Sequence, residues 1–124
     1  MINVKLEQFK AWEPCCMREM LDKVEHLFPL TSAEDIRTVA MIWSNCDDED
    51  DRKDYASAYC WLGVRAFDAE RRKKYLDNPH TKRKRDYTDE DILEHHDPGR
   101  ILWGNTYDQM WLVEELLDEQ EAEE

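Results

Sequence analysis

The spacing of the apolar residues restricts the fold of this chain most, because in several segments it repeats with the period of an α-helix. The strongest repeat lies in residues 14–28, where Pro14 suits a first helical turn and Pro29 ends the segment. Its apolar positions are Met17, Met20, Leu21, Val24, Leu27 and Phe28. Only three glycines and four prolines occur, too few for the many tight turns of an all-β fold. We therefore predict an all-α protein.

Two more helices are predicted in the middle of the chain. Ser32 and Asp35 have the spacing of a helix cap, and the apolar face that follows comprises Ile36, Val39, Ala40 and Trp43. A long helix should begin after the acids of residues 47–51, since carboxylates favour a helix N-terminus, and end at Asn78-Pro79. Its apolar positions are Tyr55, Tyr59, Trp61, Leu62, Val64, Ala66, Phe67 and Ala69. They lie on more than one side, so we expect this helix to be central.

The C-terminal third predicts a short helix and a longer one. Thr88 and Asp91 offer a cap for the short helix, which Asp97-Pro98-Gly99 should end. The last helix should begin near Thr106, with Gln109 at the reciprocal capping position. Its core face would use Met110, Val113, Leu116 and Leu117, and it should fray after Asp118.

The length of 124 residues fits one domain with one core. We therefore predict a compact helical domain of about five helices over residues 1–118, followed by an acidic tail over residues 119–124.

The charge of the chain is concentrated in its last third. Residues 86–124 hold fourteen acids and one base, Arg100, whereas residues 1–85 hold sixteen of each sign. The net charge of −13 therefore belongs to the C-terminal segment alone. So uneven a charge suggests a partner with a basic face, because complementary charge steers association.

The acids of this segment fall into two groups, one for each predicted helix. If the two helices lie side by side, about 8 to 10 Å apart, their carboxylates would form rows that imitate a phosphate backbone. In composition the chain resembles the DNA-mimic inhibitors of bacteriophages, of the anti-restriction and anti-CRISPR kinds, in which an acidic helical protein occupies a groove meant for nucleic acid. The resemblance implies a non-enzymatic inhibitor, without cofactor, that blocks a basic protein face. The expected contact residues are Asp89, Glu90, Asp91, Glu94, Glu114, Glu115, Asp118 and Glu119, with Trp111, preferred over Trp12 and Trp103, as the aromatic anchor.

A basic tract provides the first alternative. Eight of the seventeen bases fall in residues 71–85: Arg71, Arg72, Lys73, Lys74, Lys82, Arg83, Lys84 and Arg85. Lysines and arginines at this density could bind phosphates in a nucleic-acid-binding adaptor. Tyr75, His80 and Tyr87 would then stack on nucleobases. We expect internal pairing or solvation of these residues instead, because a net charge of −13 repels nucleic acid at long range. A head-to-tail homodimer through the two tracts also stays open.

The second alternative is a metal-dependent hydrolase. Glu90 and Glu94 stand one helical turn apart, with His95 and His96 beside them. No Gly-rich phosphate loop accompanies them, so we expect no enzyme and no bound metal. The four cysteines form no C-x-x-C pair, and the chain shows neither a signal peptide nor an apolar run of about 18 residues. We therefore expect reduced thiols and a cytoplasmic protein that does not enter a membrane.

Overall fold

Six helices make up the part of the chain that the computed structural model describes, namely residues 33–44, 52–79, 82–95 and 97–123. They are α3 (Ala33–Ser44), α4 (Arg52–Ala66), α5 (Ala69–Asp77), α6 (Asp89–Glu94), α7 (Pro98–Ile101) and α8 (Thr106–Ala122). The described residues form no strand, only one antiparallel bridge between Arg83 and Leu102. The all-α class is confirmed. The predicted helix over residues 14–28 and the cap at Ser32 lie outside the described residues, as do the acids of residues 47–51.

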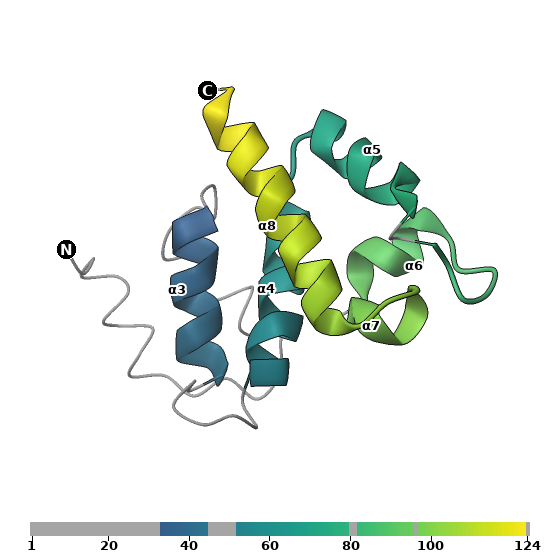
Figure 1. Cartoon of the computed structure of the whole chain (residues 1–124), viewed down its shortest axis with the longest axis horizontal. Coiled ribbons are helices and arrows are strands. Elements are labelled where there is room, and N and C mark those ends of the chain that lie inside the picture. Colours follow the sequence, from purple (N-terminus) through teal and green to yellow (C-terminus); the bar gives the residue numbers. More distant parts are fainter. Residues whose placement is uncertain (1–32, 45–51, 80–81, 96, 124) are drawn as a thin grey trace.

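Helix α4 is the centre of the fold, as predicted. It packs against α3 on one side and against α8 on the other (Figure 1). Every side chain from Ala56 to Val64 is buried. A Cβ atom at Gly63 would collide with Cγ1 of Val113 and lie 3.3 Å from Cδ1 of Leu117. The glycine therefore lets α4 and α8 approach more closely than a larger residue would allow.

The prediction of one long helix up to Asn78 is wrong, because the helix breaks at Phe67-Asp68 into α4 and α5. The Asp68 carboxylate caps α5 by accepting a hydrogen bond from the Arg71 backbone N–H at 2.8 Å. The side chain of Gln120 holds the two sides of the break: its amide oxygen accepts from the Asp68 N–H at 2.8 Å, and its amide nitrogen donates to the Ala66 carbonyl at 3.1 Å. The break redirects α5 along α8 (Figure 1).

The short helix α6 begins as predicted. The Thr88 hydroxyl accepts from the Asp91 N–H at 3.1 Å, and the Asp91 carboxylate accepts from the Thr88 N–H at 2.9 Å. The tripeptide Asp97-Pro98-Gly99, which was expected only to end this helix, also begins a further one: Pro98 is the first residue of α7.

Helix α8 begins at Thr106, as predicted, but its capping pair and its C-terminal end differ from the prediction. Its cap is the reciprocal pair Asn105 and Asp108, one residue before the predicted Thr106 and Gln109, which are both buried. At its other end the helix continues to Ala122, so the expected fraying directly after Asp118 is wrong. Contacts of the last turn explain the extension: besides the bonds of Gln120, a Glu121 carboxylate oxygen accepts from the Ala33 N–H of α3 at 2.5 Å. None of the described helices is both long and apolar enough to span a membrane.

Candidate interaction surfaces

The two acidic groups of the C-terminal third lie on different parts of the molecule. Helix α6 packs mainly on α4, whereas α8 packs on α3, α4, α5 and α7. The C-terminal half of α8 points away from α6 (Figure 1). The side-by-side pair of acidic helices that phosphate mimicry required is therefore not formed.

The acids of α6 are partly engaged within the protein. The Asp89 carboxylate forms an ion pair with Arg83, and Asp91 belongs to the capping box of α6. The side chains of Glu90 and Glu94 are exposed. Among the predicted contact residues on α6, Glu90 and Glu94 are therefore the two that are exposed and belong to neither the ion pair nor the cap.

The acids of α8 divide in the same way. Glu114 lies 3.6 Å from the Arg37 guanidinium of α3. The Glu119 carboxylate accepts a hydrogen bond from the Lys74 ammonium, which lowers the pKa of Glu119. In contrast, Glu115 and Asp118 are exposed and form no ion pair with any described residue. Internal pairing therefore reduces the predicted acidic surface of α8 mainly to these two carboxylates.

Trp111 lies on the same solvent face of α8. The side chains that face the core fall on one side of the helix: Thr106, Gln109, Leu112, Val113, Leu116, Leu117 and Gln120. At about 100° per residue, Trp111 and Asp118 point almost directly away from that side, with Glu115 beside them. Trp111 is 59% exposed, so its ring is accessible to a partner.

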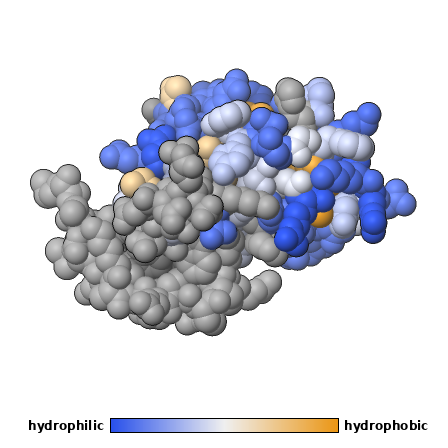
Figure 2. All heavy atoms as spheres, turned by 60° about the horizontal axis from the view of Figure 1, so that its bottom comes forward, coloured by the Kyte–Doolittle hydropathy of each residue, from blue (hydrophilic) through white to orange (hydrophobic). Residues whose placement is uncertain are grey.

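A further large apolar side chain is exposed on α3. The contacts of Ala33 with Glu121 and of Arg37 with Glu114 show that α3 and α8 run antiparallel. Met41 of α3 is 50% exposed. Among the described residues, the large apolar side chains that are exposed are those of Met41, Trp103 and Trp111. Hydrophilic residues predominate among the coloured residues of the face that Figure 2 shows.

The predicted basic tract is split by the burial of Arg71. Its side chain is only 1% exposed and lies among four carboxylates, those of Asp68, Glu70, Glu119 and Glu123. The hydrogen bond that its guanidinium donates to the Glu123 carboxylate raises the pKa of Arg71. Arg71 thus joins α5 to the end of α8 and is not available to a phosphate.

Two other bases of α5, Lys73 and Lys74, border a groove against α8 with a volume of about 590 Å³. Lys73 and Lys74 line one side, Glu115 and Glu119 the other, and Leu112 and Leu116 contribute apolar surface. Lys74 pairs with Glu119, whereas Arg72 and Lys73 are exposed. The groove carries both signs of charge and shows no preference for an anion or a cation.

The second half of the basic tract, residues 82–85, is fixed to the segment before α8. The Trp103 N–H donates to the Lys82 carbonyl at 2.7 Å, and the Lys84 N–H donates to the Ile101 carbonyl at 3.0 Å. Trp103 is 56% exposed. It received no role in the basic tract at the level of sequence, because eighteen positions separate it from Arg85 and only the fold brings the two segments together.

The aromatic residues predicted to stack beside the basic tract are placed differently. Tyr75 is fully buried, where its hydroxyl donates to the Gln109 side chain at 3.3 Å. Tyr87 is half-buried, and His80 lies outside the described residues. The exposed aromatic ring next to the basic loop is therefore that of Trp103.

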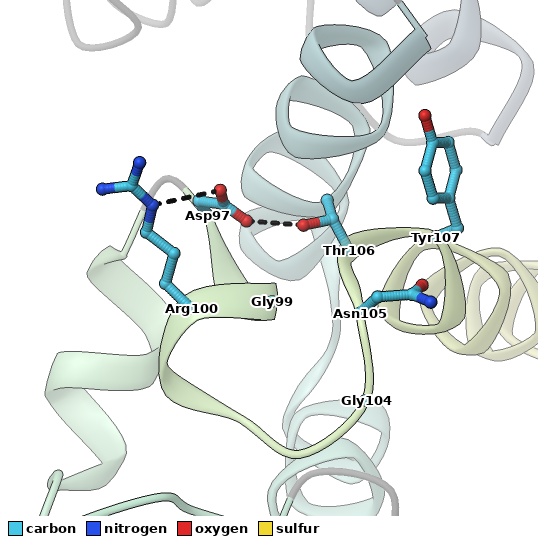
Figure 3. Close-up of a pocket in the computed structure, with 7 residues that line it drawn as sticks. All are labelled: Asp97, Gly99, Arg100, Gly104, Asn105, Thr106 and Tyr107. Carbon is cyan, nitrogen blue, oxygen red and sulfur yellow. Dashed lines mark hydrogen bonds and ion pairs between the residues drawn. The ribbon is translucent and has the colours of Figure 1, made fainter.

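A pocket of about 340 Å³ lies where α7 meets the first turn of α8 (Figure 3). Its buried carboxylate, Asp97, accepts a hydrogen bond from the Thr106 hydroxyl at 2.6 Å and lies 3.7 Å from the Arg100 Nε. A Cβ at Gly99 would lie 2.6 Å from the Thr106 backbone nitrogen. Because its charged groups pair with one another, we assign this pocket a structural role, the joining of α7 to α8.

The described residues of the hydrolase alternative, Glu90, Glu94 and His95, do not form a metal site. Within the described ranges, no group of three or more histidine, cysteine, aspartate and glutamate side chains is arranged to hold a metal ion. The Nδ1 of His95 accepts a hydrogen bond from the Asp97 N–H at 2.9 Å, and His96 lies outside those ranges. Burial raises the pKa of the Cys60 thiol, which makes it a poor nucleophile.

Comparisons with known proteins add no relative. The chain matches no protein-family model, and no curated protein or solved structure is significantly similar to it.

Proposed function

We propose that the protein is a non-enzymatic binding module that engages a basic protein surface through the exposed face of α8. The observation that carries this proposal is the grouping of Trp111, Glu115 and Asp118 on one solvent face. Buried aromatic anchors supply much of the energy of protein interfaces, and charges at the rim accelerate association with a partner of opposite sign. Internal ion pairs occupy Glu114 and Glu119, so the exposed pair next to Trp111 would meet the partner.

The narrower proposal is that the partner is a nucleic-acid-binding protein and that binding inhibits it. Such proteins carry Lys and Arg faces that complement an acidic surface. One acidic face with a central tryptophan replaces the two rows of carboxylates in this version, because α6 and α8 are not a pair. The proposal retains a cytoplasmic location and requires no cofactor.

The test is affinity capture from a nuclease-treated lysate, with the immobilised full chain, at about 50 and 500 mM salt. A protein captured through this face should be released at high salt, because salt screens exposed charges. The double reversal Glu115→Lys with Asp118→Lys should lower its affinity at least about ten-fold. Trp111→Ala should cost roughly 2 kcal/mol of binding free energy, as expected for an anchor.

The matched control is Asp86→Lys with Glu94→Lys, which changes the net charge by the same amount. Both residues are exposed and lie away from the outer face of α8. This variant should retain the partner. Equal capture by both double variants, or capture that Trp111→Ala does not affect, would contradict the proposal. If DNA displaces the captured partner, the narrower proposal of a nucleic-acid-binding partner is supported. If DNA does not displace it, that narrower proposal is contradicted.

A further inference from the structure

The structure brings an exposed aromatic ring and a basic residue together on one outward face. Arg83 and Leu102 form an antiparallel bridge, so Lys82 stands directly opposite Trp103. In such a pair, opposing residues share a face and successive residues alternate between faces. Leu102 is fully buried, whereas Lys82 and Trp103 on the other face are exposed, which agrees with this arrangement.

Further bases surround this pair. Arg85 is exposed in the same loop. The ammonium group of Lys84 donates to the Gly99 carbonyl at 3.1 Å, which brings it beside Arg100, whose side chain is 72% exposed. Arg83 pairs with Asp89 and donates to the Tyr87 carbonyl at 2.8 Å, so it is left out of this group. Arg100 also lies 3.7 Å from the Asp97 carboxylate, but most of its side chain is open to solvent.

We propose that this edge, comprising Trp103, Lys82, Lys84, Arg85 and Arg100, binds single-stranded nucleic acid. A nucleobase would stack on the Trp103 ring, and the lysine and arginine side chains would contact the flanking phosphates. A single strand fits better than a duplex, since its bases present their faces to an aromatic side chain. The surface is separate from the face of α8 in the proposed function, and the inference does not depend on that function.

The net charge of the chain does not prevent such binding. Glu115 and Asp118 lie about 14 and 18 Å along the axis of α8 from its first residue, at a rise of about 1.5 Å per residue. The Debye length at physiological salt is about 8 Å, so their repulsion is largely screened at the Trp103 edge. Closer to it, Arg83 pairs with Asp89, and Asp97 is buried beside Arg100. Among the described residues, the exposed acids that remain next to the edge are Asp86 and Asp108, fewer than the bases of the edge.

Fluorescence anisotropy with a labelled twelve-residue oligothymidylate tests the proposal on the full chain. Binding should be measurable at about 50 mM salt and weaken as salt rises. Trp103→Ala should weaken it about ten-fold, the loss expected for one stacked base. Lys82→Ala with Arg85→Ala should also weaken it and reduce the salt slope by roughly one to two, which corresponds to two phosphate contacts. The altered side chains are exposed, and circular dichroism would verify that each variant folds.

Two control variants make the outcome specific. Arg72→Ala with Lys73→Ala removes two exposed bases of α5 and should leave the affinity nearly unchanged. Trp111→Ala removes an equally exposed tryptophan from another face and should also have little effect. No binding at low salt, or equal losses from both pairs of bases, would overturn the proposal. Heparin binding as tight as that of the oligonucleotide, with no effect of Trp103→Ala on either, would identify a general polyanion surface and overturn it as well.

Discussion

One glycine determines how closely the two central helices pack. Gly63 lies inside α4, where alanine would ordinarily be preferred by about 1 kcal/mol. Here the added Cβ would collide with Cγ1 of Val113 on α8. Overpacking of a core typically costs about 1 to 3 kcal/mol, so it should exceed the gain in helix propensity. We predict that Gly63→Ala lowers the free energy of unfolding by roughly 1 to 2 kcal/mol, measured by urea denaturation.

The steric origin of this loss can be isolated by a double-mutant cycle. Val113→Ala creates space opposite Gly63 and is destabilising by itself. In that background, Gly63→Ala should cost much less than in the wild type, because its Cβ no longer collides with Cγ1 of Val113. An equal cost in both backgrounds would show that the Val113 contact is not the reason for the glycine.

Individual positions were predictable where the helical period decided them. The burial of Ile36, Val39 and Val113 follows from spacing and is confirmed. The burial of Arg71 was not predictable, because its carboxylate partners on α8 come from about fifty positions further along the chain. A run of four bases reads as a solvated surface until the fold supplies those acids.

At the level of helices, α8 illustrates how tertiary contacts offset an unfavourable local sequence. It carries acids and no bases in its last turns, although a helix C-terminus favours cations. Lys74 and Arg71 of α5 supply the missing positive charge, and the N-terminal end of α3 binds Glu121. The helix is consequently longer than its own sequence suggests.

The contact between α5 and α8 should depend on pH. Its hydrogen bond with Lys74 places the folded-state pKa of Glu119 below the ordinary glutamate value of 4.5. A depressed pKa stabilises the folded state above the unfolded value, and this stabilisation is lost as pH falls through the folded value. We predict that Glu119→Gln is less stable than the wild type at pH 7, and that the difference disappears well below pH 4. Thermal unfolding at both pH values measures this, and a constant difference would contradict it.

Helix boundaries were predictable from caps only where the signal was unambiguous. Thr88 with Asp91 predicted the start of α6 correctly. The cap at Asp68 was hidden within an uninterrupted apolar pattern, and Gln120, which holds the break, lies 52 positions away. Asn105 and Thr106 are both good caps, and the burial of Thr106 decides between them.

For the molecule as a whole, the charge segregation seen along the chain is modified by folding. The excess of acids from residue 86 onward is a property of the sequence, but among the predicted contact acids of α8 only Glu115 and Asp118 stay outside internal ion pairs. The basic edge at Trp103 arises only when residues 82–85 meet the segment before α8. Neither candidate surface could be located from the sequence alone. The surface on α8 depends on which acids are paired in the folded protein, and the edge at Trp103 combines two segments that are distant in the sequence.

The distance between these surfaces leads to a prediction about salt. Neutralising Glu115→Gln and Asp118→Asn removes negative charge about 14 to 18 Å along α8 without adding a base. At about 150 mM salt the Debye length of roughly 8 Å screens this charge, so oligothymidylate binding at Trp103 should be unchanged within about two-fold. At about 10 mM the length is roughly 30 Å, and the variant should bind the strand several-fold more tightly than the wild type because less repulsion reaches it. Anisotropy at the two salt concentrations distinguishes the cases: equal tightening at both would mean that the acids contact the strand directly and that the two surfaces are one.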